Sequence, residues 1–360
     1  MFSKIKLHQC HYHLNKLLNQ RFSSSNKLNV VPVTLTKSTK LTAPVEGTSA
    51  AIQKDETKLV DSLLSYTAKL MENAYSSINI IAFSGGVDSS LAASLVYQTF
   101  HNSGSNDSRP HRDGSVLAVL GVSPSLPDRQ LQLARNVATT IGIQLQEVKT
   151  TEGSDETYIA NKGQACFVCK NHLYSALEAV SKTAASAAAS SSSSPSQNVI
   201  LYNGTNANDT QDPTRLGLIS ASNFKVKSPL IHITKEEVRR AARHLGLPNW
   251  DYAASPCLRS RLALGVEATA QHLQAVNLAE EKVKHMLQWK EQWNMRVRML
   301  SGKRAMIELD QDFLSEKGMI QVQSILQEGD LEKYLFELGF TGGMGVRSFR
   351  SGAVSVPSSS

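Results

Sequence analysis

The chain has 360 residues and a mass of 39.3 kDa, and its 41% hydrophobic and 19% charged residues exclude wholesale disorder. It holds no run of about 18 apolar residues, so we expect no membrane-spanning helix and no membrane partner. The net charge of +7 comes from residues 1–45, which contain seven basic residues and no acid, and the remaining chain is neutral. A nucleic-acid partner is therefore not expected.

Residues 1–45 are also rich in Ser, Thr and Asn, a composition typical of an organellar transit peptide. Arg21 stands directly before Phe22 and Ser23, as at a mitochondrial processing site. We therefore expect a leader over 1–45 and a mitochondrial location, or another organelle. The alternative is a disordered tail on a cytoplasmic protein.

Hydrophobic periodicity predicts strands that alternate with helices along the next part of the chain. In chain order we expect a helix at 52–76, a strand at 78–83, a helix at 89–98, a strand at 116–122, a helix at 127–141, a strand at 144–148, helices at 155–162 and 171–182, strands at 199–202 and 225–231, and a helix at 234–245. This alternation predicts an α/β fold, with a parallel five-stranded sheet and helices on both faces.

Two stretches depart from this alternation. Residues 184–196 are Ala and Ser with one Pro, so we expect a flexible surface insertion. Beyond Gly265, a long helix at 268–289 precedes strands at 295–300 and 305–309, then further helix and a Gly-rich end. We therefore predict one domain over 52–265, a smaller α+β domain for substrate binding or oligomerisation over 266–352, and a disordered tail over 353–360.

The most specific motif is a glycine-containing loop between the first strand and the next helix, with the sequence Ser84-Gly85-Gly86-Val87-Asp88-Ser89-Ser90. Glycines allow backbone amides to approach an anion, and a helix N-terminus favours negative charge. The serine hydroxyls can donate hydrogen bonds to phosphate oxygens. Asp88 would repel a phosphate unless a cation lies between them, so the loop predicts a phosphate site that uses Mg²⁺. No Lys follows the glycines, which excludes the G-x-x-x-x-G-K-[ST] loop.

Three cysteines lie outside the leader: Cys166 and Cys169 in a C-x-x-C, and Cys257 far downstream. An odd number argues against disulfide pairing and favours metal, cluster or sulfur chemistry. Three interpretations remain open. The three thiolates hold a [4Fe-4S] cluster with an open iron site, or a structural zinc ion adds His172 as a ligand, or Cys257 alone carries sulfur.

The glycine loop resembles the pyrophosphate loop (PP-loop) of the ATP pyrophosphatases, which cleave ATP to AMP and PPi. Further strings in the chain are GTNA at 204–207, KSPL at 227–230, LGLP at 245–248, PCL at 256–258, SR at 260–261, RVR at 296–298, IE at 307–308 and FRSG at 349–352. Their order over residues 55–352 resembles the ATP-dependent sacrificial sulfur transferase family. That family is best known for thiolating the pyridinium mononucleotide precursor of the nickel-pincer cofactor.

The resemblance implies an enzyme that adenylates a carboxylate of a small nucleotide-like substrate and releases PPi. A sulfur then attacks the acyl-adenylate and expels AMP. In some relatives a cysteine gives up its own sulfur and becomes dehydroalanine, and in others three cysteines hold a [4Fe-4S] cluster that delivers an added sulfide. Because Cys166, Cys169 and Cys257 are all present, we expect the cluster version, with Cys257 as sacrificial donor the rival.

The resemblance also implies which residues form the site, and a homo-oligomer is expected. Catalytic roles are expected for Cys257, Asp88 and Arg261. Contacts with ATP, Mg²⁺ or the substrate are expected for Ser84, Gly85, Gly86, Val87, Asp88, Ser89, Ser90, Asn206, Asp209, Glu280, Arg296, Arg298 and Glu308. The metal ligands are expected to be Cys166, Cys169 and Cys257.

The chain also departs from the family pattern. Asn203 stands where Asp is usual, Arg259 replaces a small residue, and the Arg-Pro-Gly expected after Thr214 reads Arg-Leu-Gly. These changes concentrate where the substrate would bind and leave the acceptor open. Alternative functions are a tRNA thiolase, an ammonia-dependent amidotransferase or ligase of the same superfamily, and a nucleotide-binding protein without turnover.

Overall fold

The computed structural model describes residues 50–71, 77–102, 115–191, 198–211, 217–314, 318, 321–325 and 329–350. The expected leader over 1–45 and tail over 353–360 lie outside these ranges. Residues 50–360 belong to one compact unit. Within the described ranges, every helix is too short or too polar to cross a lipid bilayer.

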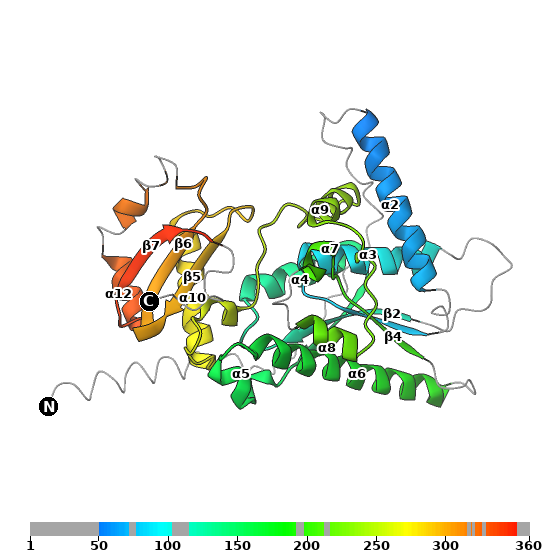
Figure 1. The fold of residues 1–360 in the computed structure, drawn as a ribbon, viewed down its shortest axis with the longest axis horizontal. Coiled ribbons are helices and arrows are strands. Elements are labelled where there is room, and N and C mark those ends of the chain that lie inside the picture. Colours follow the sequence, from blue (N-terminus) through cyan, green and yellow to red (C-terminus); the bar gives the residue numbers. More distant parts are fainter. Residues whose placement is uncertain are drawn as a thin grey trace, which may run out of the picture. The chain divides into compact units, whose positions relative to one another are not determined.

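A parallel sheet with flanking helices occupies the first part of the described chain (Figure 1). Its elements are α2 (Ala50–Leu70), β1 (Ile78–Ala82), α3 (Val87–Asn102), β2 (Ser115–Val122), α4 (Asp128–Ile141), β3 (Gln144–Lys149), η1 (Glu152–Ser154), α5 (Glu156–Ala160), α6 (Ala165–Ser191), β4 (Val199–Tyr202), α7 (Ala207–Thr210), α8 (Gly217–Asn223), α9 (Lys235–His244) and η2 (Leu258–Arg261). The strand order is β3-β2-β1-β4, with all neighbours parallel.

The expectation of five strands is wrong by one. The residues predicted as a fifth strand pair with β4 only through a single parallel bridge between Tyr202 and Lys227. Lys227 N donates to Leu201 O at 2.8 Å, and Asn203 N donates to Lys227 O at 3.0 Å. Pro229 follows two residues later and lacks the amide hydrogen that a longer ladder needs, so the pairing ends there.

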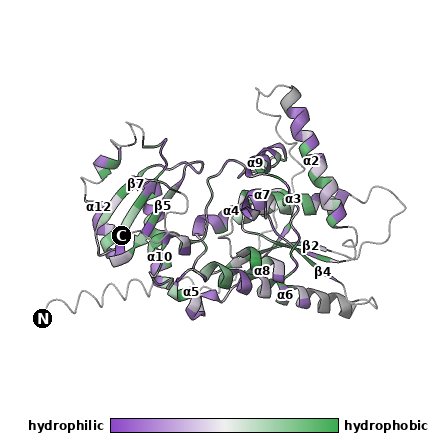
Figure 2. Cartoon of the chain, viewed as in Figure 1, coloured by the Kyte–Doolittle hydropathy of each residue, from purple (hydrophilic) through white to green (hydrophobic). Residues whose placement is uncertain are grey.

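Helices cover both faces of the parallel sheet. Ile81, Ala118 and Leu120 pack with buried residues of α3 and α4, whereas Ile80 and Val119 pack with those of α6 and α8. Figure 1 shows α3 and α4 on one side of the sheet and α6 and α8 on the other. Figure 2 shows β2 as largely hydrophobic and α9 as largely hydrophilic, which fits a strand buried on both faces and a helix at the surface.

Helix α6 is longer than the sequence predicts. It begins at Ala165 rather than near Asn171, so the C-x-x-C forms its first turn instead of preceding it. It also continues to Ser191, into the expected insertion, while residues 192–197 lie outside the described ranges. Alanine is the strongest helix former, which accounts for helix where the lack of large apolar residues suggested a loop.

A second sheet lies near the end of the chain. Its elements are α10 (Ala270–Met286), β5 (Met295–Leu300), η3 (Ser301–Lys303), β6 (Arg304–Leu309), α12 (Asp330–Glu337) and β7 (Met344–Ser348), with strand order β5-β6-β7. Strands β5 and β6 are antiparallel, as their short connection requires, and β7 pairs with β6 in parallel. Strand β7 was not predicted, because its Met-Gly-Val-Arg-Ser sequence lacks a strand pattern.

Candidate functional site

The glycine loop lies at the junction of β1 and α3, as the sequence predicts. Gly85 has φ of +70°, a conformation that favours glycine. A Cβ added at Gly85 would lie 2.6 Å from Ala134 Cα in α4, which is closer than any real contact. The loop therefore packs against α4 at a point that admits no side chain.

Hydroxyl groups of the loop are engaged within the loop itself. Ser89 Oγ accepts from Ser84 N at 3.1 Å and donates to Gly86 O at 3.0 Å. Ser90 is fully buried, and its Oγ donates to Gly86 O at 2.9 Å and accepts from Asn249 Nδ2 at 3.0 Å. Ser90 therefore stabilises the loop, and its expected phosphate contact stays a prediction.

Asp88, at the start of α3, is neutralised from elements far along the chain. Its carboxylate forms an ion pair with Lys235, the first residue of α9. It also accepts a hydrogen bond from Asn206 Nδ2 at 3.0 Å. A Cβ added at Gly204 would lie 2.5 Å from the Asp88 carbonyl carbon, so this glycine is required for the approach. Lys235 thus supplies the positive charge that we assigned to Mg²⁺ alone.

The neighbours of Asp88 are held by helix caps. Asn206 and Asp209 form a reciprocal capping box at the start of α7, and Thr234 and Glu237 form one at the start of α9. Asp209 therefore serves the cap, with Oδ2 accepting from Asn206 N at 3.2 Å. Sequence reasoning missed Lys235, although the Thr-x-x-Glu box over 234–237, which contains it, marks a helix start and hence its position.

The carboxylate of Asp88 suits Mg²⁺ in its chemistry, because this ion prefers oxygen ligands and usually shares them with substrate phosphates. The half-buried position of Asp88 beside the loop leaves it able to do so. Asp88 is therefore the residue that would hold the ion.

The side chains of the three cysteines lie close enough to interact electrostatically. Arg259 donates from its guanidinium to Cys166 Sγ at 2.6 Å, and Cys169 Sγ lies 4.0 Å from Glu152 Oε1. Burial, together with the charges of Cys257 and Glu152, raises the pKa of Cys169 to about 12. The pKa of Arg259 is raised despite its burial, because the charges of Cys257 and Cys166 outweigh the desolvation.

The ligand type suits an iron–sulfur cluster, but the positions of the thiols do not yet form a metal site. Among the described residues, no group of three or more His, Cys, Asp or Glu side chains is arranged to hold a metal ion. His172, the expected fourth zinc ligand, contacts Thr151 Oγ1 at 3.0 Å and Asp155 Oδ2 at 3.6 Å instead. The cluster and the zinc ion therefore stay predictions.

Arg261 holds the segment that carries Cys257. Its side chain is 1% exposed, and Nε donates to Glu280 Oε1 at 2.9 Å. It also donates to the backbone carbonyls of Pro256 and Cys257, the latter at 3.1 Å. Glu280 in turn accepts from Val297 N at 3.1 Å, which ties the cysteine segment to β5. The expected catalytic Arg261 is thus placed to fix the position of Cys257.

Buried charges continue along β5. Arg298 Nε donates to Glu308 Oε2 at 2.6 Å, and Arg347 NH2 donates to Glu308 Oε1 at 2.6 Å. Within the described ranges, the Arg296 guanidinium donates to two backbone carbonyls, those of Met295 and Ala254, and to no carboxylate. Burial lowers the pKa of Arg296 to about 10, with the charge of Arg261 acting in the same direction. The predicted residues Glu280, Arg296, Arg298 and Glu308 are brought together, with Arg347 as an unpredicted member.

One short segment connects the glycine loop and the cysteine segment. Gln130, in the first turn of α4, donates from Nε2 to Ser84 O at 2.6 Å. Five residues earlier, Ser125 O accepts from Leu258 N at 2.7 Å. The loop and the residue after Cys257 are therefore both hydrogen-bonded to residues 125–130.

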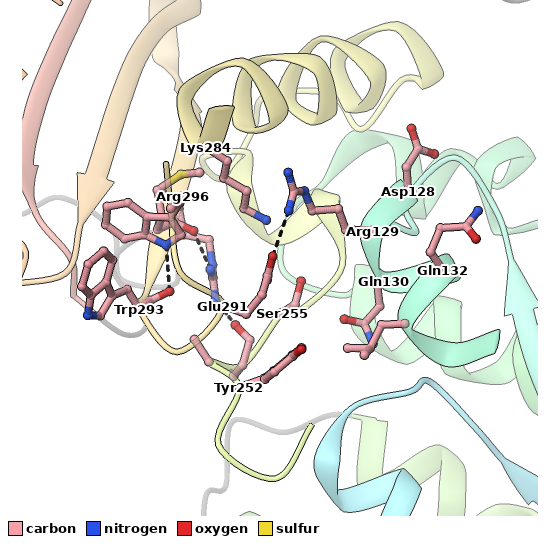
Figure 3. Close-up of a pocket in the computed structure, with 15 residues that line it drawn as sticks. Asp128, Arg129, Gln130, Gln132, Tyr252, Ser255, Lys284, Glu291, Trp293 and Arg296 are labelled. Atoms are coloured by element: carbon pink, nitrogen blue, oxygen red, sulfur yellow. Dashed lines mark hydrogen bonds and ion pairs between the residues drawn. The ribbon is translucent and has the colours of Figure 1, made fainter. Parts of the chain in front are cut away.

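A cavity of about 350 Å³ lies beside this segment (Figure 3). It is lined by residues from α4, from the stretch before Cys257, from the end of α10 and from β5. Its charged and aromatic lining residues are Asp128, Arg129, Tyr252, Lys284, Trp289, Glu291, Trp293 and Arg296. The volume lies within the usual range of small-molecule sites, roughly 300–1,000 Å³.

Two curated proteins are similar to the chain, whereas no known protein-family profile matches it. One is an uncharacterized protein of Synechocystis, 36% identical over 203 residues, or 56% of this chain and 66% of that protein, just under two thirds. The other is pyridinium-3,5-bisthiocarboxylic acid mononucleotide synthase of Lactiplantibacillus plantarum, 27% identical over 208 residues, or 57% of this chain and 67% of the synthase. The chain is a distant homologue of this synthase. The homology supports the resemblance drawn from the motifs.

Proposed function

We propose that the chain is an ATP-dependent sulfur transferase that adenylates a carboxylate of a small, nucleotide-like substrate and then transfers sulfur to the activated carbon. The name of the distant homologue describes a product with two thiocarboxylic acid groups, which supports sulfur transfer to a carboxyl carbon. The glycine loop, which resembles that of the ATP pyrophosphatases, supports the use of ATP.

The observation that carries this proposal is the double attachment of residues 125–130. Gln130 binds the glycine loop at Ser84 O, and Ser125 binds the residue that follows Cys257. Sulfur transfer to an acyl-adenylate requires that the site of ATP cleavage and the sulfur lie close together. A short segment that is hydrogen-bonded to both parts supports such proximity.

In the first step, a substrate carboxylate oxygen attacks the α-phosphorus of ATP, and the bond to the β-phosphate oxygen breaks to release PPi. The loop amides and the N-terminus of α3 would bind the departing phosphates. Lys235 adds a positive charge beside them, and Asp88 would hold Mg²⁺, which neutralises phosphate charge when bound.

In the second step, the Cys257 sulfur attacks the acyl carbon, and AMP leaves with the electron pair of the broken C–O bond. Loss of the Cα proton and cleavage of the Cβ–S bond then leave a thiocarboxylate on the substrate and dehydroalanine on the protein. Arg261 holds the carbonyls on either side of this cysteine and so fixes its backbone. If Cys166, Cys169 and Cys257 instead hold a [4Fe-4S] cluster, the cluster would supply an added sulfide and spare the protein.

The test uses the full chain with Mg-ATP and nicotinate mononucleotide, which combines a carboxylate, a pyridinium ring and a phosphate. We expect release of AMP and PPi, and a thiocarboxylate product that Cys257→Ala abolishes while PPi release persists. Anaerobic iron and sulfide analysis, with the mass of the protein after turnover, separates the cluster from the sacrificial cysteine. Production of ADP and orthophosphate, or a thiolated product from Cys257→Ala at the normal rate, would refute the proposal.

A further inference from the structure

The C-x-x-C motif places two thiols of different accessibility at the start of one helix. Cys166 and Cys169 both belong to α6, and Cys166 is exposed whereas Cys169 is half-buried. Residues three apart in an α-helix have their Cα atoms about 5 Å apart. A disulfide spans roughly 4.4–6.8 Å between Cα atoms. The two thiols can therefore close a disulfide without a large backbone movement.

Arg259 is held against Cys166 by a buried asparagine. Its guanidinium donates to Asn161 Oδ1 at 3.2 Å and to Cys166 Sγ at 2.6 Å. Asn161 is fully buried, and its Nδ2 donates to the backbone carbonyls of Ala263 and Val266, each at 3.0 Å. The guanidinium thus has a fixed position beside an exposed sulfur. A cation that donates to sulfur stabilises negative charge on it, and the thiolate is the form of cysteine that attacks a disulfide.

The N-terminus of α6 adds positive charge at the same place. The first backbone N–H groups of a helix have no partner within the helix and carry a partial positive charge. Cys166 is the second residue of α6, and no acidic residue occurs in the first turn. A C-x-x-C at a helix N-terminus beside an arginine is an environment typical of reactive thiols.

The second thiol of the motif has a different environment. Glu152 is 2% exposed and contacts Cys169 Sγ through Oε1 at 4.0 Å. Within the described ranges, Glu152 Oε2 has no hydrogen-bond partner. Buried polar atoms without a partner are uncommon, and a redox or catalytic role is one reason for them. The motif therefore combines an exposed sulfur beside a cation with a less accessible sulfur beside a buried carboxylate.

We infer that Cys166 and Cys169 form a redox-active dithiol, which reduces low-molecular-weight disulfides and closes a Cys166–Cys169 disulfide. The Cys166 thiolate attacks one sulfur of the external disulfide, whose S–S bond breaks and releases a first thiolate. Cys169 then attacks Cys166 Sγ, the mixed disulfide breaks, and the second departing thiolate takes up the Cys169 proton. The protein loses two electrons and the external disulfide gains them.

This activity is independent of the proposed function, and it leaves Cys257 as a thiol. It does limit the expected cluster, because a Cys166–Cys169 disulfide removes two of its three ligands. Exchange with disulfides and binding of a cluster therefore exclude one another in the same molecule.

The test equilibrates the full chain, without oxygen, in mixtures of reduced and oxidised glutathione. Free thiols are then alkylated, and peptide mass mapping assigns each sulfur, which also separates Cys10 from the other three. We expect a Cys166–Cys169 disulfide that dithiothreitol reverses, with Cys257 alkylated. Cys257→Ser should form the same disulfide.

Two single variants distinguish the attacking thiol from the resolving one. Cys169→Ser should retain one glutathione on Cys166, because no second thiol is present to close the disulfide. Cys166→Ser should take up glutathione on Cys169 at least about 10-fold more slowly, because this sulfur is half-buried and lacks the charged hydrogen bond of Arg259. Neither variant replaces Arg259, so both remain informative if that residue is needed for folding.

The role of Arg259 is tested in the Cys169→Ser background. Arg259→Met should slow the reaction of Cys166 with oxidised glutathione about 10-fold, as expected for loss of a charged hydrogen bond. The matched control is Arg239→Met, because Arg239 is also half-buried but donates to the backbone carbonyls of Trp250 and Tyr252. The proposal is overturned if the disulfide includes Cys257, if the two arginine variants react equally fast, or if the thiols of the full chain do not exchange, whether or not a metal occupies them.

Discussion

The two halves of the candidate site are stabilised in opposite ways. The glycine loop is held by backbone and hydroxyl hydrogen bonds among residues 84–90, which are neighbours in sequence. The region around β5 is held by buried arginine–glutamate pairs, whose partners lie 10 to 39 residues apart. The first half forms largely from local hydrogen bonds, to which Gln130 and Asn249 add neutral ones from elsewhere in the chain. The second half depends on the complete fold, because each buried charge needs its partner.

The largest loss of stability is expected at Glu308, which is fully buried between Arg298 and Arg347. Glu308→Gln should lower the free energy of unfolding by about 3–5 kcal/mol, because it leaves a buried arginine without its counter-charge. The control is Glu147→Gln, which breaks an exposed pair with Arg135 and should cost no more than about 1 kcal/mol. Equal losses in urea unfolding of the two variants would show that burial does not distinguish the pairs.

Acid should weaken the region around β5 through Glu280. Burial disfavours its ionised form, but the charge and hydrogen bonds of Arg261 outweigh this and hold the pKa of Glu280 below its ordinary value. A carboxyl group with a lower pKa in the folded than in the unfolded chain stabilises the fold above its ordinary pKa, and this contribution is lost as the pH falls through the folded pKa. Unfolding measured as a function of pH should show a loss in acid that Glu280→Gln reduces. An unchanged acid slope in that variant would contradict the assignment.

The glycine loop also depends on a distant residue, Gly204, so its stability is not purely local. Gly204→Ala would place a methyl group 2.5 Å from the Asp88 carbonyl carbon, so backbone must shift. We expect a loss of about 1–3 kcal/mol in stability, with weaker binding of α,β-methylene-ATP. Gly153→Ala is the control, because nothing lies within 4 Å of the added methyl group. Normal nucleotide binding by Gly204→Ala would show that the approach of residue 204 is not needed.

The same contrast explains which features the sequence predicts. Strand β1, the loop and the start of α3 follow from a β-branched run, two glycines and a helix start that are contiguous, and β5 is predicted with its observed limits at Met295 and Leu300. The parallel alternation of strands and helices is also visible, apart from the fifth strand, where Pro229 limits the pairing.

Contacts between distant residues could not be predicted in this way. Lys235 and Asp88 form an ion pair although they are 147 residues apart in the sequence. Arg347 and Glu308 are 39 residues apart, and Arg347 belongs to β7, whose sequence lacks a strand pattern. Arg296 and Arg298 are two residues apart in a predicted strand and so share one of its faces, and the sequence alone also allows that face to be solvated. The structure buries both, because α10 and the segment around Arg261 cover β5. Burial of a charge is decided by what packs over it, and no local pattern encodes that.

The smallest expected change in stability concerns the ion pair of Asp88 and Lys235, whose side chains are 29% and 36% exposed. Lys235→Met should change the free energy of unfolding by less than about 1 kcal/mol, because such partly exposed pairs contribute little. Thr234→Ala, which removes the cap of the same helix and leaves the ion pair, should cost about 1 kcal/mol.

In nucleotide binding, by contrast, Lys235→Met should have the larger effect of the two variants. Lys235→Met should weaken α,β-methylene-ATP roughly tenfold through loss of a charged contact, and Thr234→Ala should bind it nearly normally. If the cap variant loses as much affinity as Lys235→Met, the lysine acts only by holding α9 in place and not on the phosphates.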